Sequence, residues 1–389
     1  MNNVIEKVRK RDCTGCETCA YNCPVGVISF FHDDAGFIYP HIQNKERCIH
    51  CGKCLTACPA FNALEVPVLK KRLGEKYFWR TDIEELKKSA SGGLASYLYE
   101  QFIDQGGSVA GVSYDIKNRT AKFSVVYSLS ETEKFRGSKY IQADKSMLYH
   151  SLSEALNKGK VLFVGLPCEV VAVKLLFRKF DNLYTTELIC HGPTSSLMFD
   201  KYIDMLEKEK GVRVISYTSR YKAPFWKPMM SLVRFADGTE SVNQYTQTEL
   251  NAAFQMVKRE SCNHCPFKNG RSLADLTIGD HHAAKPEAGD YNQFGTSICL
   301  VNSTKGEEMV KRFSESSAKW GDAMHKSANA NRALNESLPR LPFRNRFVKI
   351  AREKGIREAC NDRYIYLVLK YRKFPYRIRR FIERRIGKG

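Results

Sequence analysis

Apolar residues occur at helical spacing in some segments and in short continuous runs in others, which predicts mixed α and β structure over residues 77–326. Residues 94–107 repeat apolar side chains at helical spacing and end at a Gly-Gly pair, so we expect a helix there. Residues 161–165 read VLFVG, which predicts a buried strand, and a helix is expected to follow as far as Phe180. Further expected elements are a helix at 151–160 and strands at 108–115, 121–128, 185–190, 273–280 and 297–303.

The two ends of the chain have a different texture. Residues 1–62 are short, rich in turns and cysteines, and residues 27–42 predict a hairpin around an Asp-Asp-Ala-Gly turn. Residues 215–240 predict a hairpin region whose last turn is Asp237-Gly238. From about Ser327 the chain is expected to be helical and basic. These changes divide the chain at 1–62, 75–150, 151–326 and 327–389, with the two middle segments forming parts of one domain.

Composition and charge narrow the class of protein. The 389 residues are 43% hydrophobic, which is typical of a globular chain and not of a disordered one. No run approaches the roughly 18 apolar residues of a membrane-spanning helix, and the N-terminus has no apolar signal segment. Of the net charge of +20, residues 321–389 contribute 19 Lys/Arg against 6 Asp/Glu. We therefore expect a cytoplasmic protein of two to three domains with a basic tail.

Eight of the 14 cysteines form two runs, at 13–24 and 48–59, with the spacing C-x2-C-x2-C-x3-C-P. Without an export signal, so many cysteines indicate metal ligation and not disulfides. The spacing is that of bacterial two-cluster 4Fe–4S domains, in which the fourth cysteine of each run binds the other cluster. The predicted ligands are Cys13, Cys16, Cys19 and Cys58 for one cluster, and Cys48, Cys51, Cys54 and Cys23 for the other. A pair of zinc sites is the alternative, but such sites usually combine shorter two-cysteine knuckles.

Four further cysteines lie in loop-like contexts with Gly or Pro nearby: Cys168, Cys190, Cys262 and Cys265. Cys168 begins a predicted helix, where the helix dipole and unpaired amides favour a thiolate. Two interpretations remain open: one shared metal site, or core thiols beside a lone zinc or redox pair. Cys299, within an apolar strand, and Cys360, in the tail, are expected to be unliganded.

The last twenty residues, 370–389, hold nine Lys/Arg and one Glu. On a helix, Ile378, Phe381, Ile382 and Ile386 form one apolar stripe among arginines. This pattern is typical of a helix at an anionic membrane surface, which would place the protein at the inner face of the membrane. Two alternatives stay open: a helix docked on the body, or an electrostatic landing site for an acidic ferredoxin. Nucleic-acid binding is not expected, because no recognition module accompanies the charge.

Five segments occur in the same order as in one known family: KSASGGLASYL (88–98), RGSKYIQA (136–143), GLPCEVVAVK (165–174), LICHGPTS (188–195) and SCNHCPFKNGRSLADLTIGD (261–280). Over roughly residues 75–330 the chain resembles the beta subunit of coenzyme F420-reducing hydrogenase and its dehydrogenase relatives. The resemblance implies an FAD-dependent iron–sulfur oxidoreductase. The implied fold is α+β: an N-terminal bacterial-type ferredoxin domain fused to a mixed α/β flavin-binding domain, with a basic helical C-terminal tail.

The resemblance also implies site residues. A third 4Fe–4S cluster would be held close to the flavin by Cys168, Cys190, Cys262 and Cys265. The implied flavin contacts are Ser91, Gly92 and Gly93, where Gly-Gly before a helix lets backbone amides approach a ligand, together with Ser138, Lys139, Tyr140 and Gln142. An ordinary helix-start loop and a charged loop before a strand are the alternatives. The chain departs from its relatives at GDHHAAKP (279–286), where His281 and His282 are either polar loop residues or proton donors.

The expected function is electron transfer between ferredoxin-type clusters and a bound flavin that reduces or oxidises a small molecule. That substrate is coenzyme F420 or another two-electron acceptor, and a ferredoxin or another redox protein is the expected partner. Some family members stand near polysaccharide-assembly functions, so a link to polysaccharide biosynthesis is a further expectation. The alternatives are a non-catalytic electron-transfer subunit of a larger redox complex and a metal-stabilised interaction protein.

Overall fold

The computed structural model describes residues 2–69, 71–324 and 326–372. The apolar stripe expected at 378–386 lies outside these ranges. Within them, no helix combines the length and the apolar character that crossing a membrane requires.

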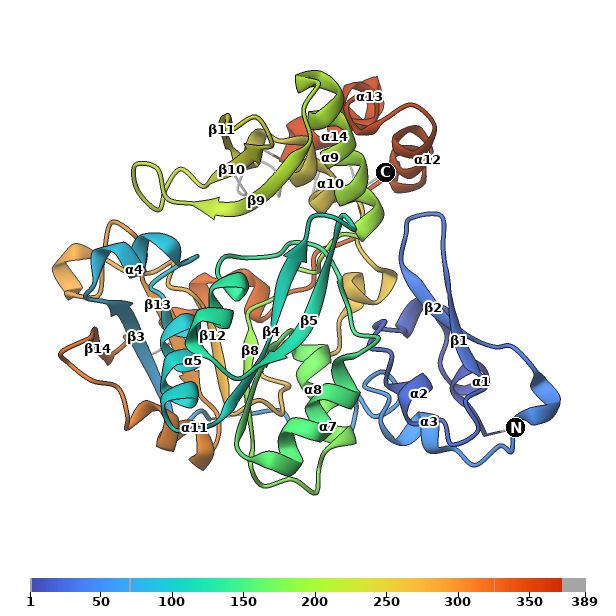
Figure 1. The fold of residues 1–389 in the computed structure, drawn as a ribbon, viewed down its shortest axis with the longest axis horizontal. Helices are drawn as coiled ribbons and strands as arrows, with labels where there is room; N and C mark the ends of the chain where they lie inside the picture. The colour runs from blue at the N-terminus through green and yellow to red at the C-terminus, as the bar shows by residue number, and fades with distance from the viewer. Residues whose placement is uncertain (1, 70, 325, 373–389) are drawn as a thin grey trace, which may run out of the picture.

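The N-terminal domain consists of two similar halves and a hairpin (Figure 1). In each half a 3₁₀ turn, η1 (Lys10–Asp12) or η2 (Lys45–Arg47), leads into the first cysteine of the run. A one-turn helix, α2 (Thr18–Tyr21) or α3 (Lys53–Thr56), then carries the third cysteine. This correspondence agrees with the repeat in the sequence.

The predicted N-terminal hairpin is confirmed. Strand β1 (Ile28–His32) pairs antiparallel with β2 (Ile38–Ile42), with Ile28 opposite Ile42. The short helix α1 (Val4–Lys7) begins at the cap residue Asn3, whose side chain accepts from the amides of Ile5 and Glu6. The buried core beneath these elements is small, and cysteines make up much of it.

A nine-stranded sheet forms the centre of the larger domain, in the order β14-β3-β13-β12-β8-β7-β4-β5-β6. Its strands are β3 (Gly74–Arg80), β4 (Ser108–Asp115), β5 (Thr120–Val126), β6 (Ala143–Asp144), β7 (Val161–Gly165), β8 (Leu183–Leu188), β12 (Leu276–Asp280), β13 (Ser297–Val301) and β14 (Ala318–Asp322). The four central strands β12, β8, β7 and β4 run parallel, while β13, β3 and β14 continue the sheet in antiparallel fashion. The sheet draws on chain from both sides of residue 150, so residues 75–326 share one framework.

Helices cover both faces of this sheet, as the central strand β7 shows. Leu162 and Val164 belong to the apolar cluster that includes α5 (Leu94–Asp104) and α11 (Thr304–Val310). Val161 and Phe163 point the other way, into the cluster with α7 (Leu148–Lys158) and α8 (Pro167–Leu176). This alternation is the side-chain period of a strand buried on both faces.

A smaller three-stranded sheet lies beside the large one, with most of the C-terminal helices around it (Figure 1). Its strands are β9 (Val214–Tyr221), β10 (Met230–Phe235) and β11 (Glu240–Gln244). Asp237-Gly238 makes the turn between β10 and β11, as predicted. The helices here are α9 (Ser196–Lys210), α10 (Glu249–Met256), α12 (Arg344–Glu353), α13 (Ile356–Asn361) and α14 (Arg363–Arg372). Two short helices, α4 (Ile83–Lys88) and α6 (Leu129–Thr132), belong to the larger domain.

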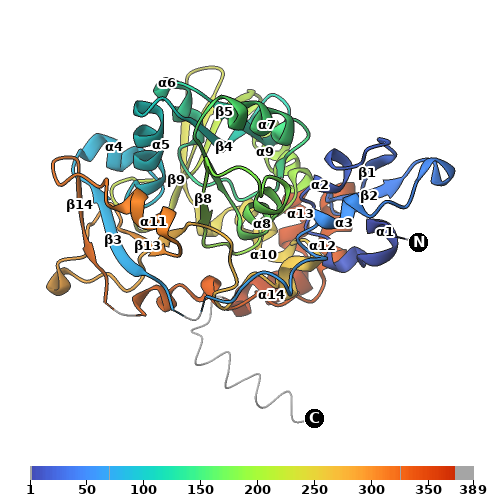
Figure 2. The same ribbon diagram turned by 90° about the horizontal axis from the view of Figure 1, so that it is seen from below.

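The N-terminal domain lies at one end of the molecule, against α7, α8 and the C-terminal helices (Figures 1 and 2). The Tyr21 ring lies 5.5 Å from that of Tyr149, and the Tyr149 hydroxyl donates to the Cys16 carbonyl. Arg352 of α12 pairs with Asp34 at the hairpin turn, 2.6 Å apart. The cysteine loops of the N-terminal domain are therefore held against the larger domain.

Candidate redox site

The two N-terminal cysteine loops share one backbone shape. Each has two residues with positive φ, Gly15 and Glu17 in the first loop and His50 and Gly52 in the second. Left-handed residues at such positions turn successive amide N–H groups toward one side of the loop, which suits a negatively charged centre.

The eight N-terminal cysteines gather in the two predicted groups. We call Cys13, Cys16, Cys19 and Cys58 the first set, and Cys23, Cys48, Cys51 and Cys54 the second set. The second set lines one cavity of about 320 Å³. In the first set, burial raises the pKa of Cys19 well above its usual value, and Cys16, Cys13 and Cys58 raise it further. Cys23 and Cys58 therefore lie with the opposite runs, although which cysteine binds which cluster stays a prediction.

The two sets differ in their surroundings. Cys51 of the second set is exposed, and the neighbouring Ile49 side chain is 61% exposed. Cys16 and Cys19 of the first set are buried, and Cys16 lies beneath Tyr149 of the larger domain. The second set thus lies near the outer surface and the first set faces the larger domain.

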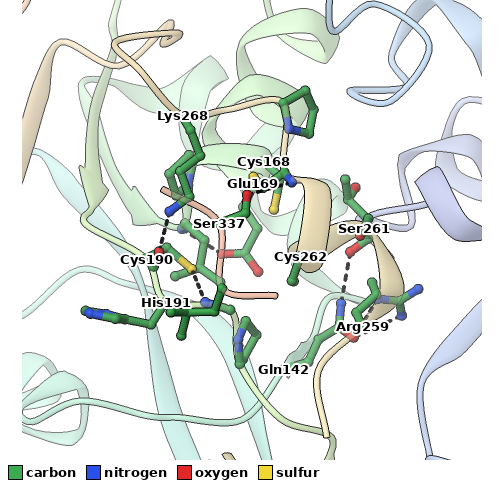
Figure 3. Close-up of a pocket in the computed structure, with 18 of the residues that line it drawn as sticks. Gln142, Cys168, Glu169, Cys190, His191, Arg259, Ser261, Cys262, Lys268 and Ser337 are labelled. Carbon is green, nitrogen blue, oxygen red and sulfur yellow. Dashed lines mark hydrogen bonds between the residues drawn. The ribbon is translucent and has the colours of Figure 1, made fainter. Parts of the chain in front are cut away.

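The four remaining loop cysteines line one cavity of about 690 Å³ in the larger domain (Figure 3). We call Cys168, Cys190, Cys262 and Cys265 the core set. Cys168 lies in the first turn of α8, Cys190 follows β8, Cys262 lies in the 3₁₀ turn η5 (Glu260–His264), and Cys265 follows that turn. The question left open by the sequence, whether these cysteines meet, is answered: they share one cavity.

The loop after β8 is shaped by Gly192. Its φ is +83°, and a Cβ atom there would lie 2.9 Å from the Cys262 Cβ, so a larger residue would be strained and would displace that cysteine. The Gly192 amide donates to the Cys190 sulfur over 3.2 Å, and the Lys268 ammonium donates to the Cys190 carbonyl over 2.6 Å. Gly192 and Lys268 therefore hold two core-set cysteines in place.

Burial dominates the protonation of the core set. It raises the pKa of Cys168 well above its usual value, with the Glu169 carboxylate acting in the same direction. It also raises the pKa of Cys262 to about 12 and that of Cys265 to about 11, with Lys268 opposing the effect on Cys265. The expected thiolate at the start of α8 is therefore not favoured by the protein alone, because burial outweighs the helix dipole. These thiols would ionise together with the binding of a cation.

The spacing of the thiols bears on the kind of metal. Among the residues that the structure describes, no three His, Cys, Asp or Glu side chains lie close enough to hold one metal ion. Cys299 is fully buried within β13, and Cys360 is half-buried in α13. Neither lines the core cavity.

Part of the wall of the core cavity comes from the N-terminal domain. Thr14, from the first cysteine loop, lines it together with Gln142 and Arg259. The Gln142 side chain donates to the Thr14 and Gly15 carbonyls at 3.1 and 3.3 Å. The first set and the core set are therefore neighbours across a shared wall.

The predicted flavin contacts do not form a single lining. Ser91 and Gly92 bond to β13 and its approach, through Thr296 and Ser297. A Cβ on Gly92 would meet the Phe78 carbonyl at 2.1 Å, so tight packing against β3 explains this glycine. The Lys139 ammonium donates to carbonyls of its own loop, and its neighbour Ser138 is half-buried. Gly93, at φ +86°, starts α5, and Gln142 belongs to the core-cavity wall.

Ser91 and Tyr140 do converge, around a buried ion pair. Arg220 of β9 makes two bonds to Asp280 at the end of β12, at 2.9 and 3.1 Å, and one to the Tyr140 hydroxyl at 3.3 Å. Lys222 donates to the Ser91 carbonyl over 2.6 Å. Burial acts against the Asp280 carboxylate, but the Arg220 guanidinium holds its pKa below the ordinary value.

Aromatic groups lie beside this ion pair. The Trp226 ring is 5.8 Å from the Arg220 guanidinium and stacks on His282 at 6.1 Å. The buried Trp226 Nε1 has no hydrogen-bond partner among the described residues. His281 is turned elsewhere, since its Nε2 lies 3.0 Å from an Asp290 oxygen. His191, on the core cavity, interacts electrostatically with Asp280, so the two places are close.

Sequence reasoning missed three of these charged residues, Arg220, Lys222 and Arg259. Arg220 and Lys222 stand at alternate positions at the end of a strand, and Lys222 is only 7% exposed. A basic residue on the buried face of a strand was a usable signal. Arg259 offered none, because its importance depends on segments distant in the sequence.

Two protein families match this chain. The family described as the C terminus of the coenzyme F420 hydrogenase/dehydrogenase beta subunit matches residues 158–323. The family of 4Fe–4S dicluster domains matches residues 12–64.

The chain belongs to the coenzyme F420 hydrogenase/dehydrogenase beta-subunit family and carries a 4Fe–4S dicluster domain at its N-terminus. It is thus an iron–sulfur protein of an oxidoreductase family. The boundaries predicted at 62, 150 and 326 stay predictions.

Two curated relatives match different parts of this family member. The coenzyme F420-dependent sulfite reductase of Methanocaldococcus jannaschii is 24% identical over 305 residues, which is 76% of this chain and 45% of that enzyme. This chain therefore spans less than half the length of that enzyme. The ketoisovalerate oxidoreductase subunit VorC of Methanothermobacter marburgensis is 30% identical over 70 residues, 18% of this chain and 87% of that subunit.

Among solved structures, a chain of the F420-reducing NiFe hydrogenase complex from Methanosarcina barkeri is similar at 18% identity. The TM-score is 0.47, and the match covers 69% of this chain and 90% of that chain.

Proposed function

We propose that this protein is an iron–sulfur flavoprotein oxidoreductase. It would pass electrons between the clusters of its N-terminal domain, a third 4Fe–4S cluster on the core set, and an FAD that exchanges two electrons with a small molecule. Cluster and flavin together supply one-electron entry and two-electron delivery. The residues of the chain supply the binding, the spacing and the local charge.

One observation carries this proposal: the core set meets around a single cavity although its cysteines come from three separate segments. Four thiols on one cavity are a complete ligand set for a 4Fe–4S cluster. A zinc ion would need all four sulfurs at about 2.3 Å from one point. The described cysteines are not close enough for that, which favours the larger centre over zinc.

The positions of the cysteine sets also support the proposal. The second set is the most exposed, the first set faces the larger domain, and the core set shares a wall with the first-set loop. Beyond the core set, His191 leads toward Asp280 and Arg220. This row of sites suits entry of electrons at the outer surface and delivery near the Arg220–Asp280 pair.

We assign the flavin end of this row to the cluster of Ser91, Tyr140, Arg220, Lys222 and Trp226. The cluster fits an anionic, aromatic ligand, because it joins a cationic side chain, a stacked pair of rings and the unpaired Trp226 N–H. Trp226 would donate to the ligand, Arg220 would offset its charge, and Tyr140 would orient beside it. Gly92, Gly93, Ser138, Lys139 and Gln142 would act through the backbone or through neighbouring loops.

The small-molecule partner is coenzyme F420 or another two-electron acceptor. The name of the sulfite reductase relative, which is F420-dependent, makes F420 the first compound to test. A ferredoxin or another redox protein would be the electron partner. A link to polysaccharide biosynthesis, location in the cytoplasm and contact of the tail with an anionic membrane stay predictions from the sequence.

Anaerobic purification of the full chain, followed by measurement of iron, sulfide and flavin, tests the proposal. Three clusters and one flavin require about twelve iron atoms and one FAD per chain. The variant Cys262→Ser should lose about four iron atoms, whereas Cys299→Ser should lose none because Cys299 lies within β13. Eight iron atoms and no flavin would overturn the proposal.

A non-catalytic electron-transfer subunit is the second candidate. Two observations favour it: the matched sulfite reductase has more than half its length outside the match, and VorC is a subunit of an oxidoreductase. This candidate predicts clusters that reduce and reoxidise but no flavin-dependent turnover by the isolated chain. Reduction of F420 by the purified chain with a chemical electron donor separates the two.

A further inference from the structure

Arg259 is buried between the first cysteine loop and the core set. Its side chain is 2% exposed. The guanidinium donates to the Cys13 carbonyl over 3.4 Å, to the Ile38 carbonyl over 2.7 Å and to the Gln142 side-chain oxygen over 2.9 Å. It thus joins the first loop and the hairpin of the N-terminal domain to the larger domain.

The fit around the guanidinium is close on every side. The Tyr39 and Phe37 rings lie 4.6 and 5.2 Å from its central carbon. A Cβ on Gly15 would approach a guanidinium nitrogen to 2.4 Å, so only glycine leaves room here. Gln142 closes the arrangement, because its amide nitrogen donates to Thr14 and Gly15 while its oxygen accepts from Arg259. Such a fork with fixed acceptors is geometry that a lysine cannot reproduce.

The backbone of Arg259 is tied to the other cysteine site. It is the cap residue of η5, and its carbonyl accepts from the Cys262 amide over 3.0 Å. Arg259 also lines the core cavity itself (Figure 3). One residue therefore contacts a first-set cysteine through its side chain and a core-set cysteine through its backbone.

The positive charge of Arg259 is not neutralised by an ion pair in the part of the chain that the structure describes; its acceptors are two carbonyls and an amide. The other buried cation at this boundary, Lys145, is paired with Glu169 at 3.0 Å. An unpaired buried charge acts over a longer range than a paired one, because the low dielectric screens it little.

We propose that Arg259 is a positioning residue that raises the reduction potentials at the first set and the core set together and holds the two sites at a fixed separation. The part that concerns the core set rests on the proposed function, and the part that concerns the first set does not. Each reduction adds one electron, and no atom moves. A nearby buried cation stabilises the added negative charge, so it favours the reduced state at both sites. The second set, beyond the first, is affected less.

Redox titrations of the anaerobically purified full chain, followed by electron paramagnetic resonance, test this assignment. The variants are Arg259→Gln, which removes the charge, and Arg259→Lys, which keeps it. Arg352→Gln is the matched control, since it removes one positive charge from an exposed ion pair at the same domain boundary. Signals are assigned by their loss in Cys16→Ser, Cys51→Ser and Cys262→Ser.

In Arg259→Gln, the ratio of oxidised to reduced first-set and core-set centres at a fixed potential should rise at least tenfold. For a one-electron couple this is a shift of about 59 mV to lower potential. Arg259→Lys and Arg352→Gln should stay within about threefold of the unmodified chain, which is half of that shift on the logarithmic scale. Magnetic coupling between the two sites should weaken in both Arg259 variants, because the fork is lost.

Two results would overturn the assignment. One is an unchanged first-set potential in Arg259→Gln with full iron content. The other is an equal shift at the second set, which indicates a general disturbance of the domain. If the unmodified chain holds only eight iron atoms, the core cluster of the proposed function fails, while a selective first-set shift still supports the role of Arg259.

Discussion

The N-terminal domain and the larger domain present cysteines in opposite ways. The first and second sets lie within residues 13–58, in two loops that repeat each other in sequence and in backbone shape. The core set is spread over residues 168–265 and is assembled by α8, the end of β8 and the η5 turn. In the first case the cysteines are neighbours along the chain, and in the second they are neighbours only in the fold.

The apolar cores of the two regions differ in the same sense. The N-terminal core contains Val4, Val27, Ile28 and Leu55, and its other buried members are cysteines. The larger domain has two extensive apolar clusters, one on each face of its sheet. A core as small as the N-terminal one seldom holds a domain together without a metal. We infer that the clusters stabilise the N-terminal domain, whereas the larger domain builds the core site from its own packing.

The strongest test compares Cys54→Ser with Cys262→Ser. In Cys54→Ser we expect loss of at least about four iron atoms and unfolding of residues 2–62, because metal binding and folding are coupled there. In Cys262→Ser the iron loss should be similar, but the thermal transition of the larger domain should move by only a few degrees. Iron analysis, limited proteolysis and calorimetry measure both. A protease-resistant N-terminal domain in Cys54→Ser would contradict the comparison.

Phe163→Ala tests the packing side of the comparison. Phe163 is fully buried in β7 and its ring lies 5.4 Å from that of Phe123. We expect the free energy of unfolding of the larger domain to fall by about 4 kcal/mol, with or without bound iron. Urea unfolding followed by circular dichroism measures the change. Tyr127→Ala, at a side chain 51% exposed, is the control and should cost below about 1 kcal/mol.

Lys145→Met tests the boundary between the two regions. The Lys145 ammonium, 1% exposed, lies 3.0 Å from Glu169, and its backbone amide donates to Glu17 over 3.2 Å. Removing the cation leaves buried carboxylates unpaired, which should cost about 3 kcal/mol. Urea unfolding and proteolysis at the boundary measure the effect. The double variant Lys145→Met/Glu169→Gln should recover part of the loss, and no recovery would mean that the ion pair is not the cause.

Lys222→Met tests a charge that the fold of the larger domain buries. Burial, with Arg220 acting in the same direction, lowers the pKa of Lys222 to about 7. The unfolded chain therefore binds more protons between about pH 7 and 10, and the unmodified protein gains stability as the pH rises through that window. The stability of Lys222→Met relative to the unmodified chain should fall by about 1 kcal/mol from about pH 7 to 9. Lys122→Met, at an exposed lysine, should leave the pH dependence of unfolding unchanged.

Prediction from sequence succeeded best where the pattern was local. Strand β7 has the predicted bounds, the N-terminal hairpin forms, and Asp237-Gly238 turns the chain between β10 and β11. Strand β12 begins three residues later than expected, at Leu276, because Asp275 bonds to Thr185 and to Lys174 and so ends the preceding loop. The grouping of the core set could not be predicted from spacing, because its members meet only through the order of strands in the sheet.

The sequence by itself determined the two N-terminal cysteine sets, the family and the main strands, because each depends on spacing within a short stretch of chain. Only the tertiary structure decided that the core set shares a cavity, that the first set faces it, and that Ser91 and Tyr140 meet at Arg220 and Asp280. It also placed Arg259 between two cysteine sites, 246 residues from Cys13. Such contacts arise when sheet order and domain docking bring distant segments together, and no periodicity along the chain records them.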